Sequence, residues 1–395
     1  MSQDNHKPLE REFDGIICFG GLDWWYHNRG HYDLQMMREL SERVPVLYVN
    51  SISMRVPKLS EGRMFFKRAW RKLQSYRRGL VRVRPNFGVY SPFSIPGKLG
   101  ASLSRPFAPG MVRRAARKMG MRNPLVWVAC PPGAQFLHAL NPTGLIYQRT
   151  DRFEAFKGVD PEFIGACNRI LFEQADLTLY CSSLLMEEEE ELGLRRAFID
   201  HGVDFERFEQ AGLKPEPPAD LKALARPLVG FVGGIDAHTF DPELFVQVAR
   251  LLPEHQFMLV GSCSLPDGWC ELPNVHLLGQ RPYEQVADYM AACDVLIMPW
   301  NQSAWIKACN PVKLKEYLAS GRPLVSTDFY ELKHYTGLLT VAEGPEAFAA
   351  GIRAALNEPG DAAQRREHVR EATWTKRSEM LLDELEQLGL RPKAQ

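Results

Sequence analysis

Lys313 and Glu316 are the two side chains of this 395-residue chain whose types and spacing most clearly suggest chemistry. They lie in Asn310-Pro-Val-Lys-Leu-Lys-Glu-Tyr-Leu-Ala-Ser-Gly321, the pattern of an amphipathic helix with Pro311 as its first residue and Gly321 as its stop. Both side chains share one face near the positive helix end, which favours phosphate. An ammonium group there can contact a diphosphate, while a carboxylate accepts hydrogen bonds from ribose hydroxyls. The alternative is a surface helix with a solvated Lys/Glu pair.

Two further segments carry groups that suit the same ligand. Lys307 precedes Asn310, so its ammonium group and that of Lys313 can bracket one diphosphate and stabilise a leaving group without a metal. The strand-like segment 230–236 contains Gly233 and Gly234, where backbone N–H groups can approach a phosphate closely. A solvated lysine and a tight turn without a ligand are the alternatives. With no Asp-x-Asp motif and no Cys/His group at zinc spacing, neither a metal nor another cofactor is expected.

In the first half, Asp151 follows the apolar run 145–148 and lies between Arg149 and Arg152. Its carboxylate should stay ionised between two cations unless it is desolvated, so it is either a catalytic base or the anchor of an ion pair. Arg149 or Arg152 can instead meet the phosphate of an acceptor. These residues mark a second candidate site.

A loop rich in aromatic and basic residues follows the first predicted strand, 15–20. The ring of Trp24 can stack on a sugar face, although tryptophans of this kind more often belong to a core. Arg29 can hydrogen-bond hydroxyls or phosphate. His31 is an alternative base to Asp151. The loop is therefore expected on the acceptor side.

Composition places the chain among ordinary globular proteins of two domains, with 45% hydrophobic and 24% charged residues. Its eight cysteines are scattered and typical of reduced cytosolic thiols. The N-terminus is polar, and no apolar run approaches the roughly 18 residues of a membrane span. Secretion and membrane spanning are both disfavoured, and a cytoplasmic location is expected.

Charge is distributed unevenly along the chain. Between Arg55 and Arg122, 18 basic residues stand against Glu61 alone, although the formal net charge of the whole chain is zero. Apolar side chains are interleaved with them: Met64, Phe65, Phe66, Trp70, Leu73 and Tyr76. This mixture favours an anionic membrane surface. The alternatives are a solvated helix paired with acidic residues elsewhere and a nucleic acid, which no zinc-finger, RNA-recognition or helix-turn-helix pattern supports.

Short apolar runs alternate with helical patterns in both halves, which predicts an α/β fold of two doubly wound, Rossmann-like sheets. The predicted strands are 15–20, 46–50, 125–129, 145–148, 177–181 and 197–199 in the first half, and 228–232, 257–261, 275–278, 295–299 and 324–327 in the second. The boundary follows Asp204, and a helical pattern returns at 361–390. Two such sheets facing each other place a ligand crevice at the carboxyl ends of their strands.

Taken together, these segments resemble the glycosyltransferases of the GT-B architecture, GT4-like and especially the branch of bacterial teichuronic-acid and exopolysaccharide sugar transferases. The segments that carry the resemblance are 201–204, 230–236, 272–283, 310–325 and 373–377. The similarity spans nearly the whole chain, and the segment 310–325 is its most specific part.

This resemblance implies an acceptor-binding domain at 1–204, a nucleotide-sugar domain at 205–372 and a helix at 373–395 that packs back on the first domain. Lys313 would contact the diphosphate and Glu316 the ribose. The loop 280–283, with Tyr283, would lie near the base, and Asp236 closes the donor motif that begins at Gly230. Asp151 falls at the position of the catalytic base in membrane-associated relatives.

One departure from the family pattern concerns Ala308, which stands where retaining members carry the first carboxylate of Glu-x7-Glu. The stereochemistry of sugar transfer is therefore open. The reaction either inverts the sugar carbon with Asp151 as the base or retains its configuration by front-side transfer.

The expected function is a metal-independent hexosyltransferase that uses a nucleotide-diphosphate sugar, with UDP as the first choice and GDP as the second. The expected acceptor is a lipid-linked glycan of bacterial exopolysaccharide or cell-surface polysaccharide synthesis, reached at the inner face of the cytoplasmic membrane. No nucleic acid is expected as a partner. The alternatives are a sugar-nucleotide epimerase or hydrolase on the same fold, and a non-catalytic scaffold of a polysaccharide assembly complex.

Overall fold

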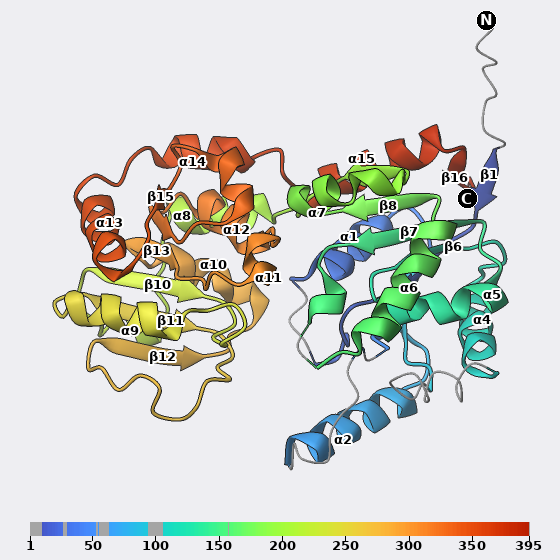
Figure 1. Ribbon diagram of the computed structural model, residues 1–395, viewed down its shortest axis with the longest axis horizontal. Coiled ribbons are helices and arrows are strands. Elements are labelled where there is room, and N and C mark those ends of the chain that lie inside the picture. The colour runs from blue at the N-terminus through green and yellow to red at the C-terminus, as the bar shows by residue number, and fades with distance from the viewer. Residues whose placement is uncertain are drawn as a thin grey trace, which may run out of the picture. The chain divides into compact units, whose positions relative to one another are not determined.

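The computed structural model describes residues 10–26, 30–52, 54, 63–93, 106–156 and 158–394, without the side chains of 63–69. The chain divides into two compact units (Figure 1). The first runs up to Asp200 and resumes at Arg377, and the second is His201–Lys376. The chain therefore crosses between the units at 200/201 and 376/377, near the expected 204/205 and 372/373.

The first unit is built on an eight-stranded sheet of order β4-β5-β3-β2-β6-β7-β8-β9, parallel except for the pair β4 and β5. Its strands are β2 (Ile16–Phe19), β3 (Val46–Val49), β4 (Val81–Arg84), β5 (Phe87–Tyr90), β6 (Leu125–Val128), β7 (Gly144–Arg149), β8 (Leu177–Tyr180) and β9 (Arg196–Phe198). The central strands are continuous apolar runs because helices cover both faces of a parallel sheet. Every residue of β2, β3 and β6 is buried.

The helices of the first unit are α1 (Tyr32–Leu40), α2 (Arg63–Arg77), α4 (Ala108–Lys118), α5 (Leu137–Leu140), α6 (Pro161–Gln174), α7 (Ser183–Glu188) and most of α15 (Trp374–Gln387). Asp160 caps α6, because its carboxylate accepts from the backbone N–H groups of Glu162 and Phe163. The two ends of the described chain pair in parallel as β1 (Arg11–Phe13) and β16 (Leu390–Pro392). This pairing fastens the segment after α15 to the start of the chain.

The second unit has a six-stranded parallel sheet of order β12-β11-β10-β13-β14-β15. Its strands are β10 (Leu228–Val232), β11 (Gln256–Val260), β12 (Val275–Gly279), β13 (Val295–Met298), β14 (Leu324–Ser326) and β15 (Thr340–Val341). Its helices are α8 (Phe205–Leu213), α9 (Pro242–Leu251), α10 (Tyr283–Ala291), α11 (Ala304–Lys307), α12 (Val312–Ser320), α13 (Pro345–Asn357) and α14 (Ala362–Val369).

Side chains of successive strand residues point to opposite faces of this second sheet and build two cores. On one face, Phe231 packs with Phe245 of α9 and Phe348 of α13. On the other, Val232 packs with Phe208 of α8 and Tyr317 of α12. Both faces are therefore covered by helices, as in a doubly wound sheet.

The predicted fold class and all the predicted strands are confirmed, whereas β1, β4, β5, β15 and β16 were not predicted. The predicted start of the Lys313 helix was wrong by one residue, because Pro311 has extended dihedral angles and caps a helix that begins at Val312. Gly321 ends that helix with a positive φ of 74°, as predicted. Among the described helices, none is both long and apolar enough to cross a bilayer.

Candidate functional site

Gly233 and Lys313 bring a strand end and a helix start into contact in the second unit. Gly233 directly follows β10, and a Cβ added to it would lie 2.2 Å from Cε and 2.8 Å from Nζ of Lys313. The ammonium group therefore lies against the backbone of the glycine loop, beside the first turn of α12. Backbone N–H groups, a helix N-terminus and a cation together favour a phosphate.

Two close contacts fix this arrangement. The hydroxyl of Tyr317 accepts a hydrogen bond from the backbone N–H of Val232 at 2.8 Å, which fastens α12 to the end of β10. A Cβ at Gly261 would lie 1.7 Å from the carbonyl oxygen of Gly233, so only glycine lets the end of β11 approach this closely. The loop that carries Gly233 is thus set by its neighbours on both sides.

Glu316 is buried one turn further along α12, with 4% of its surface exposed. It accepts a hydrogen bond from the Tyr283 hydroxyl at 3.1 Å. Burial raises the pKa of Glu316 to about 7, although the Lys313 charge and the Tyr283 hydrogen bond lower it. The guanidinium of Arg207 lies 5.4 Å from the centre of the Tyr283 ring. These four side chains form one cluster of acceptors and donors in the second unit.

Arg207 was missed by the sequence reasoning, which treated 201–204 only as a boundary motif. It occupies the first turn of α8 and pairs with Asp204 at 3.1 Å, three residues away. An acidic N-cap position followed by a basic residue inside the first turn was the signal available in the sequence.

The other residues predicted for the donor side stand in different settings. The Asp236 carboxylate accepts from the backbone N–H groups of His238 and Thr239, at 2.9 and 3.1 Å, and so holds the turn after the glycines. Lys307 is exposed at the end of α11. Asn310 is buried directly before Pro311. Asp236 therefore shapes the glycine loop, while Lys307 presents its charge to solvent.

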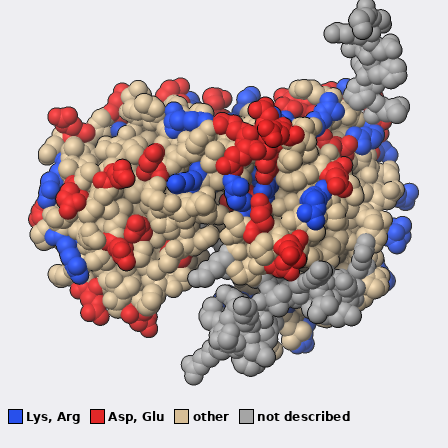
Figure 2. Space-filling model, in the orientation of Figure 1, with Lys and Arg blue, Asp and Glu red and all other residues tan. Residues whose placement is uncertain are grey.

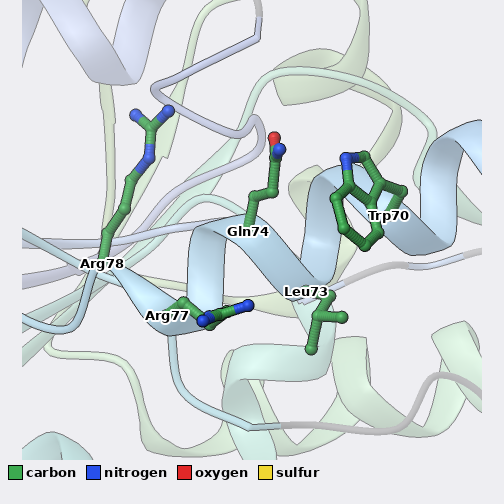
Figure 3. Close-up of a pocket in the computed structure, with 5 residues that line it drawn as sticks. All are labelled: Trp70, Leu73, Gln74, Arg77 and Arg78. Carbon is green, nitrogen blue, oxygen red and sulfur yellow. The ribbon is translucent and has the colours of Figure 1, made fainter.

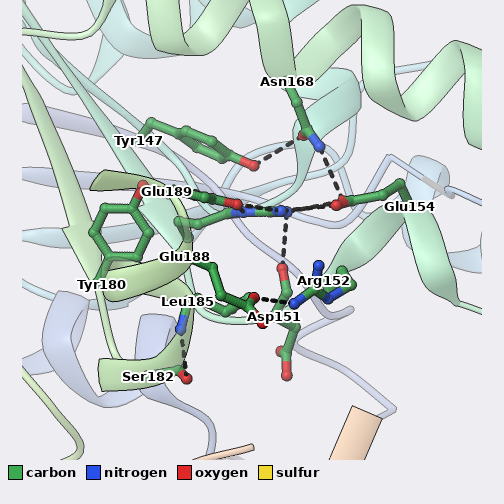
Figure 4. A network of polar contacts seen from close by, with 11 residues as sticks. Tyr147, Asp151, Arg152, Glu154, Asn168, Tyr180, Ser182, Leu185, Glu188 and Glu189 are labelled. Atoms are coloured by element: carbon green, nitrogen blue, oxygen red, sulfur yellow. Dashed lines mark hydrogen bonds and ion pairs between the residues drawn. The ribbon is translucent and has the colours of Figure 1, made fainter. Parts of the chain in front are cut away.

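In the first unit, Arg149 is buried in a polar network and is not an open phosphate site. Figure 4 shows its partners Glu154 and Glu189. Its guanidinium donates to both carboxylate oxygens of Glu154, at 2.9 and 2.8 Å, and to Glu189 at 3.1 and 2.8 Å. It also donates to the backbone carbonyl of Asp151 at 2.9 Å. The expected contact with an acceptor phosphate is therefore corrected: Arg149 is 2% exposed and its donors are taken by these partners.

This network holds Asp151 by its backbone carbonyl. Figure 4 shows the Asp151 carboxylate directed away from Glu154. Burial raises the pKa of Asp151 to about 6, against the lowering effects of the Thr150 hydrogen bond and the Arg149 charge. Arg152 pairs with Glu188. Asp151 thus combines a fixed backbone with a carboxyl group whose pKa burial raises to about 6, a combination that suits a general base.

The loop after β2 contributes differently from expectation. Trp24 is 7% exposed, and its ring centre lies 4.9 Å from that of Phe87 and 6.1 Å from that of Tyr48. It is a core residue, which corrects its expected role as a sugar platform. His31 is exposed at the N-cap position of α1. Arg29 lies outside the described residues. Among the described residues, no cluster of His, Cys, Asp and Glu is suited to a metal ion.

Comparison with known sequences finds one family match, which lies in the second unit. Residues 226–358 match the model of the glycosyl transferases group 1 family. TuaH of Bacillus subtilis strain 168, which is assigned to teichuronic acid biosynthesis as a glycosyltransferase, is 28% identical over 225 residues. That alignment covers 52% of this chain and 55% of the relative, so the chain matches about half of the relative's length.

Solved structures are similar over nearly the whole chain. Alr3699/HepE of Anabaena, solved with UDP and glucose, gives a TM-score of 0.63 at 14% identity over 95% of this chain and 100% of that one. An α,α-trehalose-phosphate synthase (UDP-forming) of Burkholderia vietnamiensis gives 0.64 at 13% identity over 96% and 99%. These likenesses show that the chain has the two-domain GT-B fold that the motifs predicted. The chain has the GT-B fold, and its residues 226–358 match the model of the glycosyl transferases group 1 family.

Proposed function

We propose that the protein is a glycosyltransferase that moves a sugar from a nucleotide-diphosphate donor to a hydroxyl of a lipid-linked glycan. The observation that carries this proposal is the contact between the Lys313 side chain and Gly233, with Glu316 one turn away. The group 1 family match and the UDP complexes of structural neighbours support it.

In the proposed donor complex, the diphosphate lies over the backbone N–H groups of the glycine loop and against Lys313. Negative charge accumulates on the departing nucleoside diphosphate as the glycosidic bond breaks. A fixed ammonium group and a helix N-terminus stabilise that charge without reorganising during the reaction. Glu316 accepts from ribose hydroxyls once its own proton is released, and UDP is the first choice of nucleotide, with GDP second.

Asp151 is proposed as the base that takes the proton of the acceptor hydroxyl. A pKa of about 6 leaves it largely ionised at neutral pH while keeping it basic enough to accept a proton. Such a displacement gives inversion at the sugar carbon. His31 is the alternative base and is exposed at the start of α1.

The proposed pathway is bacterial cell-surface or exopolysaccharide synthesis at the inner face of the cytoplasmic membrane. TuaH, with its assignment to teichuronic acid biosynthesis, supports this choice among the many uses of the fold. A lipid-linked acceptor also agrees with the basic, aromatic segment of the first unit.

A thermal-shift titration of the purified protein with UDP, GDP, ADP and dTDP tests the donor site. A nucleotide that binds only the folded state raises the melting temperature with its concentration. We expect UDP to give the largest shift, and Lys313→Ala to weaken its binding roughly 10- to 100-fold, the loss of a hydrogen bond to a charged group. Lys222→Ala, an exposed lysine of the same unit, is the matched control.

No shift with any nucleotide would favour the non-catalytic scaffold. If the nucleotide sugar is epimerised or hydrolysed at the full rate without an acceptor, the epimerase or hydrolase alternative holds and the transferase is excluded.

A further inference from the structure

Helix α2 exposes apolar side chains on its outer face. From Trp70 to Arg77, the part of α2 whose side chains are described, Trp70 is 58% exposed and Leu73 is 47% exposed. Ser75, by contrast, is fully buried. Figure 3 shows both apolar side chains projecting from α2. An ordinary surface helix buries its apolar side chains, whereas this helix leaves Trp70 and Leu73 exposed and buries a serine.

The buried face of α2 is fastened to the sheet edge by polar bonds. Ser75 donates to Asp23 at 3.0 Å and lies 3.0 Å from the Ser91 hydroxyl. Lys72 donates to the backbone carbonyl of Ser51 at 2.8 Å. These partners follow β2, β5 and β3, so three strand ends hold the helix. Because its polar side already has partners, the apolar side is available for something outside the chain.

The exposed apolar residues continue from α2 to α4 as one surface. The rings of Tyr76 and Phe93 have centres 5.4 Å apart, and those of Phe93 and Phe107 are 6.0 Å apart. Phe93 is 46% exposed, Phe107 43% and Met111, on α4, 36%. Monomeric soluble proteins rarely leave such contiguous apolar residues in water without a function. We call this the α2–α4 face.

Positive charge surrounds the α2–α4 face. The sequence contains no Asp or Glu from residue 62 to residue 150. Four basic residues of α4 are exposed: Arg113, Arg114, Arg117 and Lys118. In the part of the chain that the structure describes, no acidic side chain pairs with Arg113, Arg114 or Arg117. Figure 2 shows acidic side chains gathered instead over α7 and α15, on the other side of the same unit from α2.

The α2–α4 face also includes a hollow of about 330 Å³ that opens beside α2. Its lining combines apolar and cationic side chains (Figure 3): Trp70, Leu73, Gln74, Arg77 and Arg78. Arg78 stacks over the ring of Trp25 at 4.4 Å, and the Tyr26 hydroxyl donates to Gln74 at 3.0 Å. The face is thus joined directly to the loop after β2, the proposed acceptor side.

We propose that the α2–α4 face docks the protein on an anionic lipid bilayer, with its rings at headgroup depth and its arginines against lipid phosphates. Charge complementarity argues for this partner, since the face presents cations without carboxylates. Aliphatic Leu73 and Met111 favour a bilayer over nucleic acid, because bases stack on rings and not on aliphatic chains. The inference deepens the proposed function, since a lipid-linked acceptor lies in that bilayer.

Cosedimentation of the full chain with vesicles tests the docking, without donor or acceptor, so that it can fail independently of the glycosyltransferase proposal. The vesicles are phosphatidylcholine alone and phosphatidylcholine mixed with phosphatidylglycerol. We expect binding only to the mixed vesicles, weakening with salt. Replacing Arg113, Arg114 and Arg117 by Glu should weaken binding to the mixed vesicles roughly a hundredfold or more. Each charge near the surface contributes a factor of about ten or less.

Trp70→Ser with Leu73→Ser should weaken mixed-vesicle binding roughly tenfold while the melting temperature stays unchanged, since both side chains are exposed. The control is Leu213→Ser with Leu251→Ser, two exposed leucines of the second unit, which should bind as the parent does. If the Leu213/Leu251 variant loses as much vesicle binding as the Trp70/Leu73 variant, the assignment to the α2–α4 face is overturned. Equal binding to neutral vesicles, or tighter binding to single-stranded RNA than to mixed vesicles, would overturn the anionic bilayer as the partner.

Discussion

The ammonium group of Lys313 lies against the backbone of Gly233, with Nζ 2.8 Å from the position that a Cβ on this glycine would take. The contact joins the end of a central strand to the first turn of α12. Any side chain at position 233 would occupy the space of the lysine stem. The absence of a side chain at Gly233 therefore determines where the proposed phosphate-binding charge is held.

Gly233→Ala should displace Lys313 and weaken nucleotide binding roughly 10- to 100-fold, because a hydrogen bond to a charged group is lost. The new methyl group would meet Cε at 2.2 Å, and a flexible lysine end can move where backbone cannot. The fold should therefore survive with a small change in melting temperature. Nucleotide titration measures the effect. Gly165→Ala, where a Cβ would meet nothing within 4 Å, should bind nucleotide as the parent does.

Glu316→Gln should stabilise the free protein at alkaline pH. Burial raises the pKa of Glu316 from 4.5 to about 7, so between these values the folded chain keeps a proton that the unfolded chain has released. Stability contributed by this site therefore falls as pH rises from 4.5 to 7. A neutral glutamine, which can still accept from Tyr283, avoids the loss. The gain should grow to at most about 3 kcal/mol near pH 8.

Urea denaturation of parent and variant at acidic and alkaline pH measures this difference. Little difference is expected near pH 4.5, where the parent carboxyl is protonated in the folded chain. The exposed Glu271→Gln is the control and should give no pH-dependent gain. The same Glu316 variant should bind nucleotide more weakly, since a carboxylate accepts ribose hydroxyls better than an amide does. A gain that is equal at both pH values would show that ionisation of Glu316 is not its source.

The sequence was informative where each element has its own local pattern. The strand 228–232, its closing glycines and the helix stop at Gly321 could all be predicted, because apolar runs and glycine positions act locally. The short strands at the sheet edges could not be predicted in this way. β1 and β16 have three residues each and pair across almost the whole chain, and β4 is an alternation of Val and Arg at the sheet edge.

Side-chain roles that depend on distant partners were the harder part. Arg149 was predicted to be free for a phosphate because its neighbours in sequence are polar. In the structure its guanidinium is bound by Glu189, which is 40 residues away in the chain. Trp24 joined the core through Phe87, which belongs to one of the unpredicted strands. The contact between Gly233 and Lys313 spans two elements, and the pattern of either alone did not reveal it. Tertiary contacts therefore decided which candidates remain open to a ligand.

Arg149→Leu should destabilise the first unit by about 3–5 kcal/mol, because it leaves two carboxylates without their buried partner. The affected groups are Glu154 and Glu189, which Arg149 contacts at 2.8 Å each. Thermal unfolding measures the loss. The combined variant with Glu154→Leu and Glu189→Leu should recover part of the stability, since it removes the buried charges together. Equal stability of Arg149→Leu and the parent would contradict the structural role.

Asp151→Asn should lower turnover roughly 100- to 10,000-fold while leaving nucleotide affinity unchanged, the usual effect of removing a general base. The base must be ionised to accept a proton. With a pKa of about 6, kcat of the parent at saturating donor should rise as pH increases through 6 and then level off. The variant should lose this rise. Steady-state rates across pH with donor and a lipid-linked acceptor measure both effects.

Glu188→Gln is the matched control for Asp151, because it changes the adjacent partner of Arg152 and leaves the proposed base intact. It should keep both the rate and the pH profile of the parent. If Asp151→Asn retains normal turnover, His31→Ala becomes the decisive variant, because the alternative base would then carry the reaction. A loss of the pH-dependent rise in His31→Ala, with Asp151→Asn unaffected, would move the proton transfer from the end of β7 to the start of α1.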